Sequence, residues 1–413
     1  MDGKKRIMTL LSAALLLTGC TMRAGTAAPT AAPSPAVTAT PRPTATPLPE
    51  QPTPTPDPFR AEELLANMTL EEKVGQLFIV RPDALDPSQQ IGQIEDSASP
   101  GVTGMSESIG NMLVRYPVGG VAFFGKNITS PEQLSAFTAA LQNASKTPLF
   151  IAVDEEGGMV TRLAGAEGFS LPVYESAAAV GARGSDAAWE MGAAIGGYLT
   201  AYGFNVDFAP VADVNTNPYN PVIGSRAFSS DAAEAALMAG AMARGLASAG
   251  IIPVYKHFPG HGDTAQDSHL ALAVTEKTKQ ELLDCELVPY RINDLTGCAV
   301  MVGHIAVPAV TGDSTPASLS RAVVTGLLRE ELGFDGLVIT DALSMGGIAR
   351  YHTSGEAALA ALQAGCDLLL MPLDLGEAYR AVLSAAEDGT IPTGRMDESV
   401  IRILEYKHAA GLI

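Results

Sequence analysis

The segment IIPVYKHFPGHGDTAQDSH, residues 251–269, joins a short apolar run to a loop with three of the chain's six histidines. The β-branched run IIPVY is typical of a buried parallel strand. In an α/β barrel, the loops that follow the carboxyl ends of such strands carry the catalytic groups. A solvated loop would explain the glycine and proline turns, but it would not require three histidines. We therefore interpret the segment as a barrel strand followed by an active-site loop.

Seven other apolar runs occur along the chain, and helix-like segments separate most of them. A doubly wound open sheet is the structural alternative, but no G-x-G-x-x-G motif follows the first run. Eight buried strands within residues 59–413 match the number expected of one barrel. The predicted fold class is α/β, a single TIM-like (β/α)8 barrel forming the catalytic domain. The strand candidates are residues 77–80, 118–124, 149–154, 206–214, 251–257, 299–305, 336–341 and 366–372.

Two segments of different composition precede this domain. Residues 1–20 combine a basic KKR start, the apolar run IMTLLSAALLL and the tetrapeptide LTGC, which ends at Cys20. The apolar run is too short for a stable transmembrane helix, and LTGC is similar to a bacterial lipobox, so we predict a lipoprotein signal peptide with lipidation at Cys20. An ordinary cleaved signal peptide is the alternative. Residues 21–58 are almost wholly Thr, Pro, Ala and Ser, which predicts a disordered, extended linker. The expected location is extracytoplasmic, anchored to the bacterial cell membrane by lipid alone.

Charge and cysteine content exclude several classes of function. The net charge of −19 disfavours nucleic-acid binding, because the surface repels phosphate. The three cysteines after Cys20 show no CxxC spacing and predict neither a disulfide framework nor a metal site. His257 and His261 have the H-x3-H spacing of a metal-binding helix, but Phe-Pro-Gly between them prevents that helix. We expect no metal, no cofactor and a monomer.

Polar side chains end nearly every predicted strand. In a barrel these ends converge on one mouth, so the polar groups should lie together. A single carboxylate at such a place could instead be a helix N-cap. The residues in question are Asp154, Asp213, Asn215, Lys256, His257, His304 and Asp341.

Three groups of residues could carry chemistry. Asp341 ends the apolar run GFDGLVIT, where a partly buried carboxylate can act as nucleophile or general base; a helix cap is the alternative. Asp267 and His269 are two residues apart, so on an extended segment they project to the same side and form a carboxylate–histidine pair suited to proton transfer. A polar surface loop is the alternative there. Arg162, Arg226 and Lys256, with Asp154, could bind sugar hydroxyls, although any of these cations could be an ordinary surface charge.

Taken together, four sequence blocks resemble glycoside hydrolase family 3, and most closely its bacterial β-N-acetylhexosaminidase branch. KHFPGHGDTAQDSH is similar to the signature loop of that branch. DEEGGMVTR (154–162), FAPVADVNTNPYNPVIGSRAF (208–228) and ITDALSM (339–345) match further blocks in the expected order. The resemblance runs from about residue 59 to the end of the chain and implies a retaining hydrolase on a TIM-like barrel.

The resemblance also implies roles for single residues. Asp341 aligns with the nucleophile, and His269, paired with Asp267, aligns with the histidine acid/base of this branch. Asp154, Arg162, Arg226, Lys256 and His257 align with positions that hold the terminal sugar. Many family members place a carboxylic acid/base in a second domain; the printed chain ends at Ile413, and we expect the histidine pair to do that work. Where DQEGG would be expected this chain has DEEGG, so Glu155 adds negative charge beside Asp154 and could alter recognition.

The predicted function is a retaining exo-β-N-acetylglucosaminidase that removes non-reducing terminal GlcNAc from peptidoglycan-derived or related oligosaccharides. A β-glycoside phosphorylase or β-glucosidase of the same family is an alternative, since a histidine does not repel phosphate as a carboxylate does. A catalytically inactive wall-binding lipoprotein is an alternative of another class, against which the presence of both Asp341 and His269 argues. A Schiff-base aldolase could use Lys256 but leaves Asp341 and the histidine pair unexplained.

Overall fold

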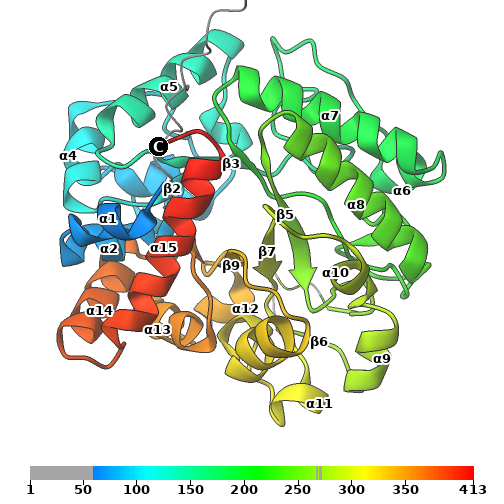
Figure 1. The fold of residues 1–413 in the computed structure, drawn as a ribbon. Helices are drawn as coiled ribbons and strands as arrows, with labels where there is room; N and C mark the ends of the chain where they lie inside the picture. Colours follow the sequence, from blue (N-terminus) through cyan, green and yellow to red (C-terminus); the bar gives the residue numbers. More distant parts are fainter. Residues whose placement is uncertain (1–58, 267, 269–271) are drawn as a thin grey trace, which may run out of the picture. The chain divides into compact units, whose positions relative to one another are not determined.

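Eight parallel strands form the centre of the catalytic domain and confirm the predicted barrel (Figure 1). The computed structural model describes residues 59–266, 268 and 272–413. The predicted signal peptide and linker, Cys20, Asp267 and His269 lie outside the described residues. In the described part, the strands are β1 (Phe78–Val80), β2 (Gly120–Phe123), β3 (Phe150–Val153), β4 (Val206–Asp207), β5 (Ile252–Phe258), β7 (Ala299–Val302), β9 (Val338–Thr340) and β10 (Leu369–Leu370).

The strand order is β10-β1-β2-β3-β4-β5-β7-β9, and a parallel bridge between Ile339 and Leu368 joins the two ends. The barrel is therefore nearly closed. Each of the eight apolar runs contains a strand, because residues buried on both faces of a parallel sheet form continuous apolar runs. In the run 206–214, β4 covers only Val206–Asp207, but pairing with β5 continues to a parallel bridge between Val211 and Lys256.

Helices surround the strands and pack on their outer faces (Figure 1). Thr69 begins one of them through a capping box, in which Glu72 N–H donates to Thr69 Oγ1 over 3.2 Å and Thr69 N–H donates to Glu72 over 3.0 Å. The α-helices are α1 (Ala61–Ala66), α2 (Leu70–Gln76), α3 (Ile91–Glu95), α4 (Glu107–Arg115), α5 (Pro131–Ala144), α6 (Ala177–Gly181), α7 (Ser185–Ala201), α8 (Ala232–Ser248), α9 (Lys279–Asp284), α10 (Val288–Ile292), α11 (Pro308–Thr311), α12 (Gly346–Ala349), α13 (Ser354–Ala364), α14 (Leu375–Glu387) and α15 (Thr393–Ala409). A π-type helical segment covers Ala322–Glu331.

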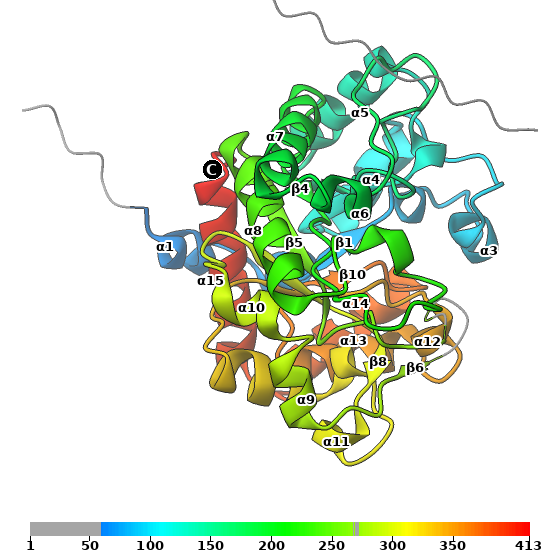
Figure 2. The same ribbon diagram turned by 90° about the vertical axis from the view of Figure 1, so that its right-hand side faces the viewer.

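The two ends of the barrel differ. Helices α1 and α2 pack against α15, and Figure 2 shows α1 and α15 on the side of the barrel opposite α3 and α12. The loops that follow the carboxyl ends of β1 and β9 lead to α3 and α12. No helix in the described ranges is long and apolar enough to cross a membrane.

Two local features were not predicted. The amphipathic segment 276–290 forms two short helices, α9 and α10, because Cys285 leaves the helical region at φ −135° and ψ −82°. Beyond the barrel, β6 (Ala273–Val274) and β8 (Ile305–Ala306) form a small parallel sheet. This sheet holds the chain that leaves the loop after β5 against the chain that leaves β7.

Candidate active site

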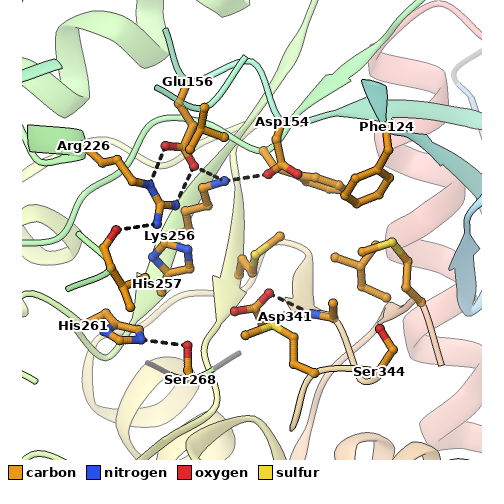
Figure 3. A pocket seen from close by; sticks show the side chains of 18 of the residues that line it. Phe124, Asp154, Glu156, Arg226, Lys256, His257, His261, Ser268, Asp341 and Ser344 are labelled. Carbon is orange, nitrogen blue, oxygen red and sulfur yellow. Dashed lines mark hydrogen bonds and ion pairs between the residues drawn. The ribbon is translucent and has the colours of Figure 1, made fainter. Parts of the chain in front are cut away.

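A pocket of about 380 Å³ lies at the carboxyl ends of the strands (Figure 3). Six of the predicted site residues line it, and they come from β5 and from the segments that follow β3, β4 and β9. They are Asp154, Arg162, Arg226, Lys256, His257 and Asp341. Asp213, Asn215 and His304, which also end predicted strands, are not among the residues that line the pocket. The barrel topology therefore brings together residues that are up to 187 positions apart (341 − 154) in the sequence.

A buried network of opposite charges forms one side of the pocket (Figure 3). Lys256 Nζ lies 2.7 Å from an Asp154 oxygen and 2.6 Å from a Glu156 oxygen. Arg226 binds Glu156 with two parallel hydrogen bonds of 2.8 and 2.7 Å, the bidentate geometry that fixes a guanidinium most firmly. Arg162 Nη2 donates to the other Asp154 oxygen over 3.3 Å. Three cations and two carboxylates thus hold one another in place.

The network keeps its members charged. Burial alone would raise the pKa of Glu156, but Lys256 and Arg226 outweigh it and hold that pKa at about 2. Burial opposes the charged form of Asp154 as well, yet Lys256 and Arg162 lower its pKa. Burial would lower the pKa of Lys256, but Asp154 and Glu156 raise it above its ordinary value. At neutral pH, the pocket therefore presents a fixed ammonium, two guanidinium groups and carboxylate oxygens, which suit the hydroxyl groups of a sugar.

Asp213 holds two histidines at the end of β5. Its Oδ2 lies 2.7 Å from His257 Nδ1, and its Oδ1 accepts a 2.6 Å hydrogen bond from the His261 N–H. Asp213 is fully buried, and His257 lowers its pKa against the opposing effect of burial. The carboxylate therefore orients the His257 ring and leaves its Nε2 as the nitrogen not engaged by Asp213.

Asp341 follows β9 and lies half-buried in the pocket wall (Figure 3). Its Oδ1 accepts a 2.8 Å hydrogen bond from the Ala342 N–H. The next helix, α12, has Met345 as its N-cap, so Asp341 is not the helix cap that was the alternative interpretation. His304, fully buried, lies 2.8 Å from the Ala342 carbonyl oxygen through Nε2 and supports the turn after Asp341.

Glu155 does not line the pocket, so its charge does not enter polar recognition directly. Its carboxylate is fully buried and accepts hydrogen bonds from the N–H groups of residues 162–164, at 2.6, 3.0 and 2.8 Å, and from the Tyr198 hydroxyl at 2.9 Å. Glu155 therefore fixes the backbone that carries Arg162. The departure from DQEGG acts on loop structure beneath the site.

Sequence reasoning missed several pocket residues. Glu156 follows two other carboxylates, Asp154 and Glu155, in the DEEGG block, and the sequence does not show which of the three face the pocket. The Phe124 ring lies beneath two guanidinium carbons, with Arg81 at 4.2 Å and Arg162 at 5.2 Å from its centroid. The position of Phe124 at the carboxyl end of the run 118–124 was the available signal. Apolar side chains complete the wall, namely Phe208, Met301, Met345, Leu370 and Met371.

Among residues 59–266, 268 and 272–413, no group of three His, Cys, Asp or Glu side chains is arranged to hold a metal ion. The site is instead a polar pocket with an aspartate at the end of β9 and a cation-rich wall, at the mouth of an α/β barrel. This combination defines the class as a barrel enzyme whose pocket suits a polyhydroxylated substrate.

The chain matches the Glycosyl hydrolase family 3 N terminal domain over residues 69–406, and it belongs to that family. It is 34% identical to the β-hexosaminidase A of Pseudoalteromonas piscicida, covering 74% of this chain and 56% of that protein. It is 39% identical to the β-hexosaminidase LpqI of Mycobacterium tuberculosis, covering 72% of this chain and 77% of that protein. Among solved structures, a family 3 β-N-acetylglucosaminidase from Paenibacillus superposes with a TM-score of 0.75 at 38% identity, covering 84% of this chain and 63% of that one.

Proposed function

We propose that this protein is a retaining exo-β-N-acetylglucosaminidase that releases terminal GlcNAc from oligosaccharides. Membership of glycosyl hydrolase family 3 supports cleavage of O-glycosidic bonds. The names of the similar proteins, β-hexosaminidase and β-N-acetylglucosaminidase, support the choice of sugar. The single observation that carries the proposal is the placement of Asp341 in the same pocket as the Asp154–Lys256–Glu156–Arg226 network.

In the first step, the Asp341 carboxylate attacks the anomeric carbon of the terminal sugar. As the bond from that carbon to the glycosidic oxygen breaks, the protonated His269 imidazole gives its proton to the departing oxygen. In the second step, neutral His269 takes a proton from water, and the water oxygen displaces Asp341. The sugar leaves with the configuration it had in the substrate, and both residues return to their starting protonation states. Asp267 orients and charges the imidazole.

The charged wall binds the sugar during both steps. Asp154 and Lys256 present an acceptor and a donor 2.7 Å apart, which suits a pair of neighbouring hydroxyl groups. Arg162, stacked on Phe124, contributes a further donor, and His257, held by Asp213 through Nδ1, presents its Nε2 to the sugar. These groups hold one another before substrate arrives, so little reorganisation is required on binding.

Initial rates on a panel of 4-nitrophenyl β-glycosides, with and without phosphate, test the activity. The proposal predicts that the N-acetylglucosaminide is cleaved fastest and that phosphate leaves the rate unchanged. NMR of the first sugar released should show the β-anomer. Faster turnover of the glucoside, or formation of a sugar 1-phosphate, would favour the β-glucosidase or phosphorylase alternative. Release of the α-anomer would contradict a retaining mechanism.

We further propose that the natural substrates are fragments of peptidoglycan outside the cell membrane, cleaved by a monomer that a lipid on Cys20 holds there. The sequence signals for export and lipidation support this location. Membrane association through lipid requires no transmembrane helix.

A further inference from the structure

Glu95 and Arg81 line the pocket, although neither belongs to the wall that binds the terminal sugar in the proposed function. Arg81 follows β1, and Glu95 is the last residue of α3. Arg81 Nη2 lies 3.3 Å from Glu95 Oε2, and the guanidinium carbon of Arg81 lies 4.2 Å from the centre of the Phe124 ring. Figure 3 shows Phe124 on the opposite side of Asp154 from Glu156. The Arg81–Glu95 pair is therefore a second charged feature of the pocket, on its Phe124 side.

Cations, rather than apolar packing, hold the end of α3 in place. No residue of α3 is buried. Lys126 Nζ donates to the carbonyl oxygens of three residues at the end of α3, at 2.8, 2.9 and 3.2 Å, and it lies 3.5 Å from the fully buried Asp83. Arg81 Nη1 donates to the carbonyl oxygen of Ile94 over 2.8 Å. The last carbonyl groups of a helix have no partner within it, so these cations satisfy them and fix the backbone that carries Glu95.

The carboxylate of Glu95 keeps one oxygen for a ligand. Its Oε2 faces Arg81, whereas Oε1 forms no hydrogen bond or ion pair within the part of the chain that the structure describes. An ionised carboxylate only accepts hydrogen bonds. Because Glu95 lines the pocket, its second oxygen can accept a hydrogen bond from a hydroxyl or amide N–H group of a bound sugar.

The exposure of the charged side chains separates the closed end of the pocket from its open end. The side chains of Glu156 and Lys256 are 2% and 3% exposed, that of Asp154 is 18% exposed and that of Glu95 is 30% exposed. Helix α3, which carries Glu95, lies at the outer edge of the catalytic domain (Figure 2). An exo-acting enzyme holds the terminal sugar at the closed end of its pocket, so the rest of the substrate must leave through the open end. Glu95 is therefore placed beside the part of the substrate that follows the scissile bond.

We infer that Glu95 is a specificity-determining residue for the leaving group. Its second carboxylate oxygen accepts a hydrogen bond from a hydroxyl or amide N–H group of the sugar that follows the scissile bond. Arg81 and Lys126 fix the place of Glu95 before substrate arrives, so little reorganisation is required on binding. The inference rests on the proposed function, because it names the subsite that the leaving group of that reaction occupies.

The test uses Glu95→Ala, which removes the acceptor from a partly exposed position. For wild type and variant, kcat/KM is measured on a GlcNAc disaccharide and on the methyl β-glycoside of GlcNAc. Both substrates release an alcohol whose oxygen needs a proton, but only the disaccharide has a sugar as its leaving group. A hydrogen bond to a charged group is a strong one, so we expect a loss of about tenfold on the disaccharide and less than about threefold on the methyl glycoside. Glu95→Gln keeps one acceptor oxygen and should lose less on the disaccharide than Glu95→Ala.

Asp397→Ala is the matched control. The side chain of Asp397 is 27% exposed and lies 2.8 Å from Lys73, so the control removes a similarly exposed, paired carboxylate that does not line the pocket. Such a pair contributes little to stability, and both variants should therefore fold. The ratio of the two kcat/KM values should be the same in Asp397→Ala as in the wild type.

Equal losses on the disaccharide and the methyl glycoside would place Glu95 against the terminal sugar and overturn the inference. An unchanged disaccharide rate in Glu95→Ala, or the same selective loss in Asp397→Ala, would overturn it as well. The proposed function would stand in each of these cases, because the wild type hydrolyses both substrates. A wild-type protein that hydrolyses neither would refute the proposed function itself and the inference with it.

Discussion

Glu156→Gln removes one buried negative charge from the pocket wall while keeping the size of the side chain. Glu156 is 2% exposed and accepts hydrogen bonds from Lys256 at 2.6 Å and from Arg226 at 2.8 and 2.7 Å. In the variant, the amide oxygen can still accept one of these bonds, but the amide nitrogen is a donor that faces other donors. Lys256 and Arg226 are left with one carboxylate fewer.

The pKa of Glu156 gives the stability that Glu156→Gln should lose. The site lowers it from 4.5 to about 2, and each pKa unit is worth about 1.4 kcal/mol, so the charged form gains about 3 kcal/mol of stability at pH 7. A carboxylate with a lowered pKa contributes fully above its unfolded pKa and loses that contribution as the pH falls toward its folded pKa. The difference between wild type and Glu156→Gln should therefore shrink to about 2 kcal/mol at pH 3.5.

Urea unfolding at pH 7 and pH 3.5 measures this difference. Glu95→Gln is the matched control, because it removes the same charge from a partly exposed pair in which Arg81 lies 3.3 Å away and Glu95 is 30% exposed. Such a pair is worth about 0–1 kcal/mol. If the free energies of unfolding of Glu156→Gln and Glu95→Gln differ by less than about 0.5 kcal/mol at pH 7, the buried network does not stabilise the fold as argued.

Three further predictions concern other parts of the chain. Lys407 is fully buried beside Gln76, and burial lowers its pKa to about 7. Above that pH the folded state binds fewer protons than the unfolded state, so the stability of the wild type rises with pH. Between pH 6.5 and 8.5 the free energy of unfolding should rise by about 2 kcal/mol in the wild type, and this rise should be missing in Lys407→Met. No such gain would show that Lys407 stays charged. His269→Ala should hydrolyse a natural disaccharide about 10²–10⁴-fold more slowly than the wild type, with a far smaller loss of rate on an activated aryl glycoside. Asp267→Ala should lose less rate than His269→Ala. Equal losses of rate on both substrates would show that His269 only binds the substrate. Wild-type protein should fractionate with membranes and Cys20→Ser should not, whereas a wild-type protein that is never membrane-associated would refute the lipid anchor.

The sequence predicted the barrel because each strand is buried on both faces and so forms an apolar run. It also predicted which residues meet, since the carboxyl ends of parallel strands share one end of the barrel. Asp154 and Asp341 directly follow β3 and β9, Lys256 lies near the carboxyl end of β5, and all three line the pocket. Asp213, Asn215 and His304 also end predicted strands but do not line the pocket. Topology therefore brings the strand ends together, and side-chain direction decides which residues face the pocket.

The partners of these residues could not be predicted in the same way. Whether Glu155 or Glu156 faces the pocket depends on the turn after β3, where Gly157 and Gly158 have φ values of 78° and 72°. The sharing of Asp213 between two histidines likewise depends on how the loop after β5 folds back. Such contacts are set by tertiary packing, and the sequence marks only the residue types.

The split of 276–290 into α9 and α10 has a similar origin. The local pattern favours one continuous amphipathic helix. In the folded chain, however, Lys277 pairs with the buried Glu286, and the Leu287 N–H donates to the carbonyl oxygen of Leu282. These contacts draw the chain out of the helix at Cys285.

The most direct test of the account is to trap the covalent intermediate that it assigns to Asp341. The protein is incubated with a slow fluorinated N-acetylglucosaminyl donor, digested and mapped by mass spectrometry, with Asp341→Asn as the control. The account predicts that one added sugar appears on the peptide containing Asp341 and that the control carries none. A stable label on a different carboxylate, or an equal label on the control, would contradict the assignment of Asp341 as the nucleophile.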